Sequence, residues 1–310
     1  MVEKLLADFR AGDKVAAARI ITMLEKGDPK GKEILKDLYK QCGRGYVIGL
    51  TGPAGAGKST LTDALVKELR KKDYRVGVVA IDPTSPFTGG ALLGDRIRMG
   101  DIAMDPGVFI RSMGTRGNLG GLSWEARDAL TVLDAFGCDY LIVETVGAGQ
   151  SQVEVEKVVD TVVMVTVPGL GDDIQANKAG IMEIGDLYVV NKADRGDADQ
   201  VVRYLEASLE LGHKTEGWQP RVCKTIAWKG EGVADVLDAI TAHRSFLEET
   251  GKLEEMRKIR TYEEIIARAR KMVIDELKEY KGINEIVERV YNRDQDPITA
   301  AEELVNSVVK

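Results

Sequence analysis

Short runs of consecutive apolar residues, many of them β-branched, recur through the middle of the chain. A strand with one face in water would alternate apolar and polar residues, and these runs are too continuous for that. Buried, mostly parallel strands explain the pattern better. The runs are YVIGL from Tyr46, VGVVAI from Val76, VFI from Val108, YLIVE from Tyr140, TVVMVTV from Thr161 and LYVVN from Leu187.

Amphipathic segments of helical length lie between several of these runs, as in residues 60–71 and 123–136. This β-α alternation is typical of a doubly wound sheet with helices on both faces. We therefore predict an α/β fold, a three-layer domain with a mostly parallel central sheet, over residues 45–244.

Helical patterns occupy both ends of the chain. Residues 1–44 carry apolar positions at three- and four-residue steps, interrupted at Gly12-Asp13 and at Gly27-Asp28-Pro29, and predict an N-terminal helical extension. Residues 245–310 are dense in good helix formers and predict a C-terminal helical extension. Its last helix should begin at Pro297, with Asp296 as its cap.

Composition and charge narrow the class of protein. Apolar residues make up 44% and charged residues 30% of the chain, as in a folded, soluble protein. A net charge of −7 disfavours nucleic acid as a partner. The first residues mix charges and contain no long apolar stretch, so we expect neither a signal sequence nor a membrane span. The widely separated Cys42, Cys138 and Cys223 argue against a disulfide framework and favour the cytoplasm.

The strongest chemical signal is GPAGAGKST, which follows the first apolar run and precedes an amphipathic segment. This is the P-loop pattern in its required strand-loop-helix context, and it predicts a P-loop NTPase. Its glycines let backbone N–H groups surround phosphates, Lys58 reaches the β and γ oxygens, and the hydroxyl of Ser59 ligates Mg²⁺. The predicted nucleotide-binding residues here are Gly52, Pro53, Ala54, Gly55, Ala56, Gly57, Lys58, Ser59 and Thr60.

Acidic residues that end other strands are candidates for the magnesium site. Glu144 follows four apolar residues, and Asp82 ends the VGVVAI run. Asp95 lies in the long loop that follows, and Gly147 could offer its backbone N–H to the γ-phosphate. The alternative for Glu144 is that it merely ends a strand at the surface.

The segment Asn191-Lys192-Ala193-Asp194 follows the last apolar run and predicts a guanine site. A carboxylate at Asp194 accepts both N1–H and the exocyclic amine of guanine, which adenine cannot match. Lys192 would cover the base, and Asn191 would tie this loop to the P-loop. Alone, NKAD could be a polar helix cap. A weaker signal places the backbone of Ile226 and Ala227 near the guanine carbonyl.

With these motifs in order, the chain resembles the MeaB/ArgK family, the methylmalonyl-CoA mutase-associated GTPases. The resemblance rests on GLTGPAGAGKST, VAIDPTSPFTGGALLGDRIRM, FIRSMGTRGNLGGLS, ETVGAGQSQVEVEKVVD, PGLGDDIQANKAGIMEIGDL and VVNKAD, and extends over nearly the whole chain. It implies a fold shared with signal-recognition and nickel-chaperone GTPases. It also implies a homodimer in which residues 245–310 form an arm between subunits.

The resemblance further implies a slow GTPase that gates delivery of adenosylcobalamin to an acyl-CoA mutase, protects that mutase and is stimulated by it. Ser59, Asp82, Asp95 and Glu144 fall on the family's magnesium and water network. A switch that senses the mutase falls on Asp172, Asp173, Gln175 and Lys178. The catalytic residues would be Lys58, Asp82, Glu144 and Lys178.

Physical reasoning agrees with the role of Lys178, because a lysine swung toward the γ-phosphate would stabilise transition-state charge as an arginine finger does. The alternative is that the charges of this segment are solvated. The family commonly has Ser-Ala where this chain has Ile226-Ala227, so a side-chain hydroxyl contact there is lost.

Other functions stay open at this point. A nickel-insertion GTPase shares the P-loop and sheet but should carry a Cys/His metal site, whereas His213 and His243 have no nearby cysteine pair. A kinase acting on a transport-binding protein is a more distant alternative. A regulatory nucleotide-binding module with negligible turnover is a third, which low activity of the isolated protein would not exclude. The sequence identifies no cobalamin site, and methylmalonyl-, isobutyryl-, ethylmalonyl- and hydroxyisobutyryl-CoA mutases all fit as partner.

Overall fold

The computed structural model describes residues 2–82, 100–114, 123–145, 155–169, 184–211 and 217–308, with only the backbone of Asp82 and Leu211. The chain divides into two compact units, Met1–Thr250 and Gly251–Lys310. The functional division predicted at residues 44 and 244 stays a prediction.

A parallel sheet of seven strands forms the centre of the first unit, in the order β3-β2-β4-β1-β5-β6-β7. The six predicted strands are confirmed. The seventh, at the edge, was not predicted because RVCK is short and partly exposed. The strands are β1 Tyr46–Thr51, β2 Val76–Asp82, β3 Val108–Gly114, β4 Tyr140–Thr145, β5 Thr161–Thr166, β6 Leu187–Val190 and β7 Arg221–Lys224.

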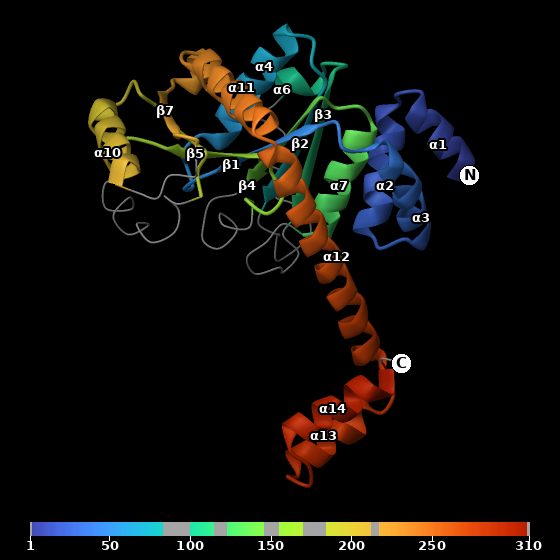
Figure 1. Cartoon of the computed structure of the whole chain (residues 1–310). Coiled ribbons are helices and arrows are strands. Elements are labelled where there is room, and N and C mark those ends of the chain that lie inside the picture. Colours follow the sequence, from blue (N-terminus) through green and yellow to red (C-terminus); the bar gives the residue numbers. More distant parts are fainter. Residues whose placement is uncertain are drawn as a thin grey trace. The chain divides into compact units, whose positions relative to one another are not determined.

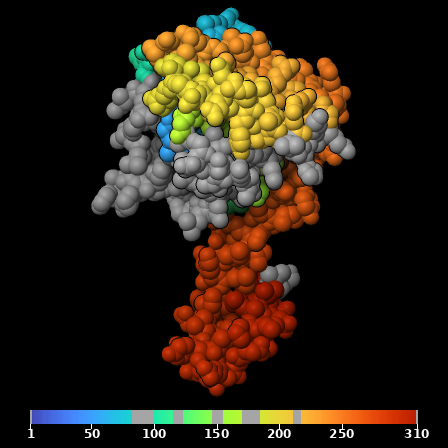
Figure 2. Space-filling view, turned by 90° about the vertical axis from the view of Figure 1, so that its left-hand side faces the viewer, coloured from blue at the N-terminus to red at the C-terminus, as the bar shows by residue number. Residues whose placement is uncertain are grey.

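Helices cover both faces of this sheet, which confirms the three-layer α/β prediction. The helices α4 (Lys58–Lys71) and α11 (Val233–Glu249) pack together on one face, and α7 (Trp124–Ala135) packs on the other (Figure 1). At the far edge α10 (Ala198–Leu211) packs on β6 and β7 and presents its outer side to solvent (Figure 2, yellow). The short elements are α6 Gly100–Ala103, η1 Tyr39–Gln41 and η2 Ala227–Lys229.

Three helices form the predicted N-terminal extension: α1 Val2–Arg10, α2 Lys14–Glu25 and α3 Pro29–Leu38. The carboxylates of Asp13 and Asp28 accept hydrogen bonds at the starts of α2 and α3, which explains the breaks in the sequence pattern. Apolar residues of all three helices join one core with α7 and the adjacent sheet face. The extension therefore belongs to the first compact unit.

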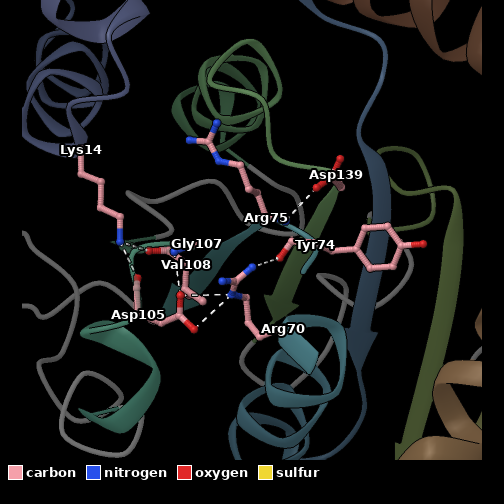
Figure 3. A network of polar contacts seen from close by, with 8 residues as sticks. All are labelled: Lys14, Arg70, Tyr74, Arg75, Asp105, Gly107, Val108 and Asp139. Carbon is pink, nitrogen blue, oxygen red and sulfur yellow. Dashed lines mark hydrogen bonds and ion pairs between the residues drawn. The ribbon is translucent and has the colours of Figure 1, made fainter. Parts of the chain in front are cut away.

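Polar contacts also attach α2 to the edge of the sheet (Figure 3). The Lys14 ammonium donates to the carbonyl oxygens of Asp105 and Val108, both at 2.6 Å. The Asp105 carboxylate in turn accepts from Arg70 of α4 at 3.1 Å, and this bond lowers the pKa of Asp105. The turn that contains Asp105, just before β3, thus connects α2 on one face of the sheet with α4 on the other.

The second unit consists of α12 Lys252–Glu279, α13 Ile283–Tyr291 and α14 Pro297–Val308, which pack on one another. Asp296 accepts from the backbone N–H groups of Ile298 and Thr299, so the predicted cap of the last helix is confirmed. On α12 the exposed apolar residues include Ile259, Tyr262 and Ile266. No helix among the described residues combines the length and apolar character needed to cross a bilayer.

Candidate functional site

The carboxyl ends of neighbouring parallel strands converge at one edge of the sheet, where ligands of open α/β folds bind. At this edge β1 leads into the loop of residues 52–57 and then into α4. The register places Glu144 of β4 beside Leu50 of β1. Asn191 directly follows β6, on the other side of β1. The predicted phosphate-binding loop, the Glu144 carboxylate and the Asn191 amide therefore all lie at this edge of the sheet.

Two glycines of the loop are required by its geometry. Gly52 has φ 143°, and a Cβ there would lie 2.0 Å from the carbonyl oxygen of Val165. Gly57 has φ 86°, and its Cβ would lie 2.4 Å from the side-chain nitrogen of Asn191. Any larger residue would clash and would also be strained at positive φ. The loop consequently turns tightly against β5 and the segment after β6.

Positive charge gathers at the start of α4. Gly57 is the N-cap and provides no side-chain cap, in contrast to Asp13, Asp28 and Ser123 on other helices. Lys58 is buried, and its ammonium donates to the carbonyl oxygens of Gly52 and Pro53 at 2.9 Å each. A helix N-terminus, a glycine-rich backbone and an ammonium group together favour an anionic group such as phosphate.

A buried carboxylate lies beside the same helix turn. Glu144 is 2% exposed, and its two oxygens accept hydrogen bonds from Ser59 at 2.5 Å and from Thr62 at 3.0 Å. Hydroxyl and carboxylate oxygens are the donors that Mg²⁺ prefers, so this pair fits the ion. Within the described ranges, no three His, Cys, Asp or Glu side chains come together as a metal site.

The other predicted metal ligands are described only in part. The backbone of Asp82 ends β2 at the same edge, one residue beyond Ile81, which pairs with Thr145 of β4. Asp95 lies outside the described residues, as do Gly147 and the predicted switch residues Asp172, Asp173, Gln175 and Lys178.

Asn191 connects three segments of the site. Its amide nitrogen donates to the carbonyl of Ala56 at 2.9 Å. Its amide oxygen accepts from the Thr225 hydroxyl at 3.0 Å and from the Ala227 N–H at 3.1 Å. Since Asn191 is 2% exposed, water cannot replace these partners. One side chain thus holds the P-loop, the segment after β6 and the turn after β7 together.

The residues predicted to read a base lie next to this connection. Lys192, at φ 57°, donates to the carbonyl of Gly55 at 2.7 Å, and Asp194 is exposed two residues later. The Ile226 N–H donates to Glu231 at 3.0 Å, and the Ala227 N–H is bonded to Asn191. Both of these donors already have acceptors inside the protein, so a guanine contact at this turn would require a shared bond or another donor.

Two residues of the site were missed by the sequence analysis. Thr62 and Thr225 both donate hydroxyl hydrogen bonds to buried polar side chains of the site. The only signal for Thr62 is its position three residues after Ser59, on the same side of a helix. Nothing in the sequence pattern marks Thr225.

The chain is similar in sequence to a family of GTPases. The family model for the "Methylmalonyl Co-A mutase-associated GTPase MeaB" matches residues 17–282. A Pyrococcus abyssi protein named as a GTPase is 48% identical over 317 residues, covering 100% of this chain and 97% of that protein. The GTPase ArgK of Escherichia coli is 36% identical, covering 92% and 87%. The mouse "Methylmalonic aciduria type A homolog, mitochondrial" is 32% identical, covering 81% and 65%.

Solved structures agree with these matches. A crystal structure titled "LAO/AO transport system kinase" has a TM-score of 0.75 and 27% identity, covering 100% of this chain and 98% of that chain. A nickel complex of HypB from Helicobacter pylori, at TM-score 0.51, 17% identity and coverage of 71% and 96%, shares the fold alone. From the extent of the family match and the identity to its relatives, the chain belongs to the MeaB family of methylmalonyl-CoA mutase-associated GTPases.

Proposed function

We propose that this GTPase uses GTP hydrolysis to gate the loading of adenosylcobalamin onto an adenosylcobalamin-dependent acyl-CoA mutase. The observation that carries the proposal is the match to the mutase-associated family over residues 17–282, from α2 into the C-terminal unit. The name of the mouse relative, which refers to methylmalonic aciduria, supports the same role. No observation on the described residues favours nickel insertion.

The proposed nucleotide site uses the loop and helix at the end of β1. Backbone N–H groups within residues 52–60, where Pro53 has none to donate, and the Lys58 ammonium hold the phosphates. Ser59 and Glu144, with Asp82 and Asp95, hold Mg²⁺ directly or through water. The ion would neutralise charge that develops on the β and γ oxygens. Lys58 already lies across the loop, within hydrogen-bond distance of two of its carbonyls.

Guanine selection is assigned to Asp194. Its exposed carboxylate follows Lys192, whose ammonium is fixed on Gly55, so the base would lie beside the P-loop. The carboxylate accepts from N1–H and from the amine of guanine. An Asp194→Asn variant presents one donor and one acceptor instead. It should therefore prefer xanthosine triphosphate, whose base offers N1–H and a carbonyl oxygen.

The proposed partner switch comprises Asp172, Asp173, Gln175 and Lys178. In this proposal mutase binding moves Lys178 toward the γ-phosphate, where its charge stabilises the transition state. Lys178→Ala should keep GTP affinity within about twofold and lose most of the stimulation by the mutase, since an added cation of this kind is worth about 10³-fold or more.

The proposed assembly is a homodimer formed through the second unit. Ile259, Ile266 and Val273 of α12 are spaced seven residues apart and are 53%, 51% and 36% exposed. Such spacing places apolar side chains along one seam that a second helix can cover. Charged residues at 257, 264, 271 and 278 lie on another side of the same helix. A second copy of α12 is the proposed occupant.

Cofactor loading of a purified apo-mutase tests the proposed function. Mutases acting on methylmalonyl-, isobutyryl-, ethylmalonyl- and hydroxyisobutyryl-CoA are each mixed with this protein and adenosylcobalamin, with GTP or a non-hydrolysable analogue. Loading is monitored by the cobalamin absorption spectrum. For the true partner, the extent of loading should differ between GTP and the non-hydrolysable analogue. Asp194→Asn should support loading with xanthosine triphosphate and not with GTP. Equal loading with and without nucleotide, for every mutase, would contradict the proposal.

A further inference from the structure

Glu144 receives a second hydroxyl hydrogen bond, from a residue outside the P-loop motif. Thr62 is completely buried on α4, and its hydroxyl donates to one carboxylate oxygen of Glu144 at 3.0 Å. Ser59 donates to the other oxygen at 2.5 Å. The two hydroxyls are three residues apart on one helix and therefore lie on the same side. Together they hold both ends of one carboxylate.

This double contact restricts the carboxylate in a way that either bond alone would not. With one hydrogen bond, a carboxylate can rotate about its last side-chain torsion, which has a broad energy profile. With both oxygens bonded to one rigid helix, the plane of the carboxylate is fixed. Glu144 is 2% exposed, so water is poorly placed to replace a lost donor. Hydrogen bonds to carboxylates are also among the stronger ones in proteins.

We propose that Thr62 is a positioning residue for the magnesium site, which orients Glu144 toward Ser59 and the metal. The inference rests on the proposed roles of Ser59 and Glu144 in holding Mg²⁺. Groups that hydrogen-bond to metal ligands typically change metal affinity by 10- to 100-fold when they are removed. Thr62 should therefore affect Mg²⁺ binding without touching the nucleotide itself.

A packing role is the competing explanation, because Thr62 is also part of the buried side of α4. Substitutions of Thr62 by valine and by serine distinguish the packing role from the hydrogen-bonding role. Thr62→Val keeps the shape of the side chain and removes the donor, whereas Thr62→Ser removes a methyl group and keeps the donor. A matched control is Thr161→Val. Thr161 is equally buried, but its hydroxyl contacts Tyr46 and His243 at the opposite end of the sheet.

The experiment measures Mg²⁺ binding by its effect on the rate of nucleotide release. Full-length protein is loaded with fluorescent mant-GDP, chased with excess GDP, and the release rate is followed as free Mg²⁺ is varied. The midpoint is the free Mg²⁺ concentration at which the release rate lies halfway between its values in EDTA and in saturating Mg²⁺. Thr62→Val should raise this concentration about tenfold. It should leave the release rate in EDTA unchanged. Thr62→Ser and Thr161→Val should stay near the wild-type midpoint. If Thr62→Val does not fold by circular dichroism, Thr62→Ala replaces it.

Three results would overturn the inference. A midpoint for Thr62→Val within twofold of wild type would show that the hydroxyl is not needed. A shift of equal size in Thr62→Ser, or in Thr161→Val, would show that packing or general loosening is responsible. Glu144→Gln separates failure of the inference from failure of the site. If Glu144→Gln shifts the midpoint and Thr62→Val does not, the proposed magnesium site is kept and the role of Thr62 is rejected. If neither variant shifts the midpoint, the proposed magnesium site itself is wrong.

Discussion

Replacing Asn191 by alanine should cost the first unit about 3 kcal/mol of folding free energy. The side chain makes three hydrogen bonds of 2.9 to 3.1 Å, to Ala56, Thr225 and Ala227, besides a longer one of 3.5 Å to the Gly57 carbonyl. Each of the three is worth about 1 kcal/mol net, and the Ala227 N–H would be left buried without this acceptor. The same change releases the P-loop from the turn after β7. We therefore expect mant-GDP affinity to fall about tenfold or more, by over 1.4 kcal/mol.

Tryptophan fluorescence in urea provides the assay, because Trp124, Trp218 and Trp228 all belong to the first unit. Thr225→Val, which removes one of the three bonds, should cost about 1 kcal/mol. In Asn191→Ala the same change should cost almost nothing further, since its acceptor is already gone. A loss below about 1 kcal/mol for Asn191→Ala, or full additivity of the two changes, would refute the role of Asn191 as the connection between these segments.

Three further predictions concern other parts of the molecule. Lys58→Ala should weaken GTP binding by about 3 kcal/mol, roughly a hundredfold in Kd, because an ammonium bonded to phosphate is lost; near wild-type affinity by calorimetry would disprove the P-loop assignment. Burial lowers the pKa of His243 from 6.5 to about 4 in spite of Asp160, so its neutral form is favoured in the folded state. Stability should thus fall by about 3 kcal/mol as pH drops from about 6.5 to about 4, and His243→Gln should flatten this dependence in urea unfolding. Ile266→Asp should convert the proposed dimer to monomer by light scattering, whereas Val15→Asp, at a similarly exposed position (56%), should not; an unchanged mass for Ile266→Asp would remove this face from the interface.

The five inner strands could be predicted from sequence because nearly all their described residues are buried, so each contains an apolar run. At one edge, β3 was predicted from its first residues, of which Val108 and Phe109 are buried. β7 could not be predicted, since an edge strand of four residues with exposed ends carries no such run. Helix starts were predictable where a side chain caps them, as at Asp13, Asp28 and Asp296. The break between α12 and α13 was not predicted, because Tyr280 to Gly282 carries no capping side chain.

For the candidate site, motif spacing selected Lys58, Ser59, Glu144 and Asn191, whose side chains contact the P-loop or the start of α4 in the structure. It could not show that Thr62 contacts Glu144, 82 positions away, because that contact depends on which strand lies beside β1. The same limit applies to Thr225, which reaches Asn191 only through the pairing of β6 with β7. Motifs identify residues along the chain, whereas sheet order decides which of them meet.

The most direct test of the account is GTP turnover by the purified protein with Mg²⁺, alone and with each candidate adenosylcobalamin-dependent mutase. We expect slow hydrolysis of GTP alone and marked acceleration by one mutase, reduced in Lys178→Ala. Hydrolysis that no candidate mutase accelerates would contradict the proposed function.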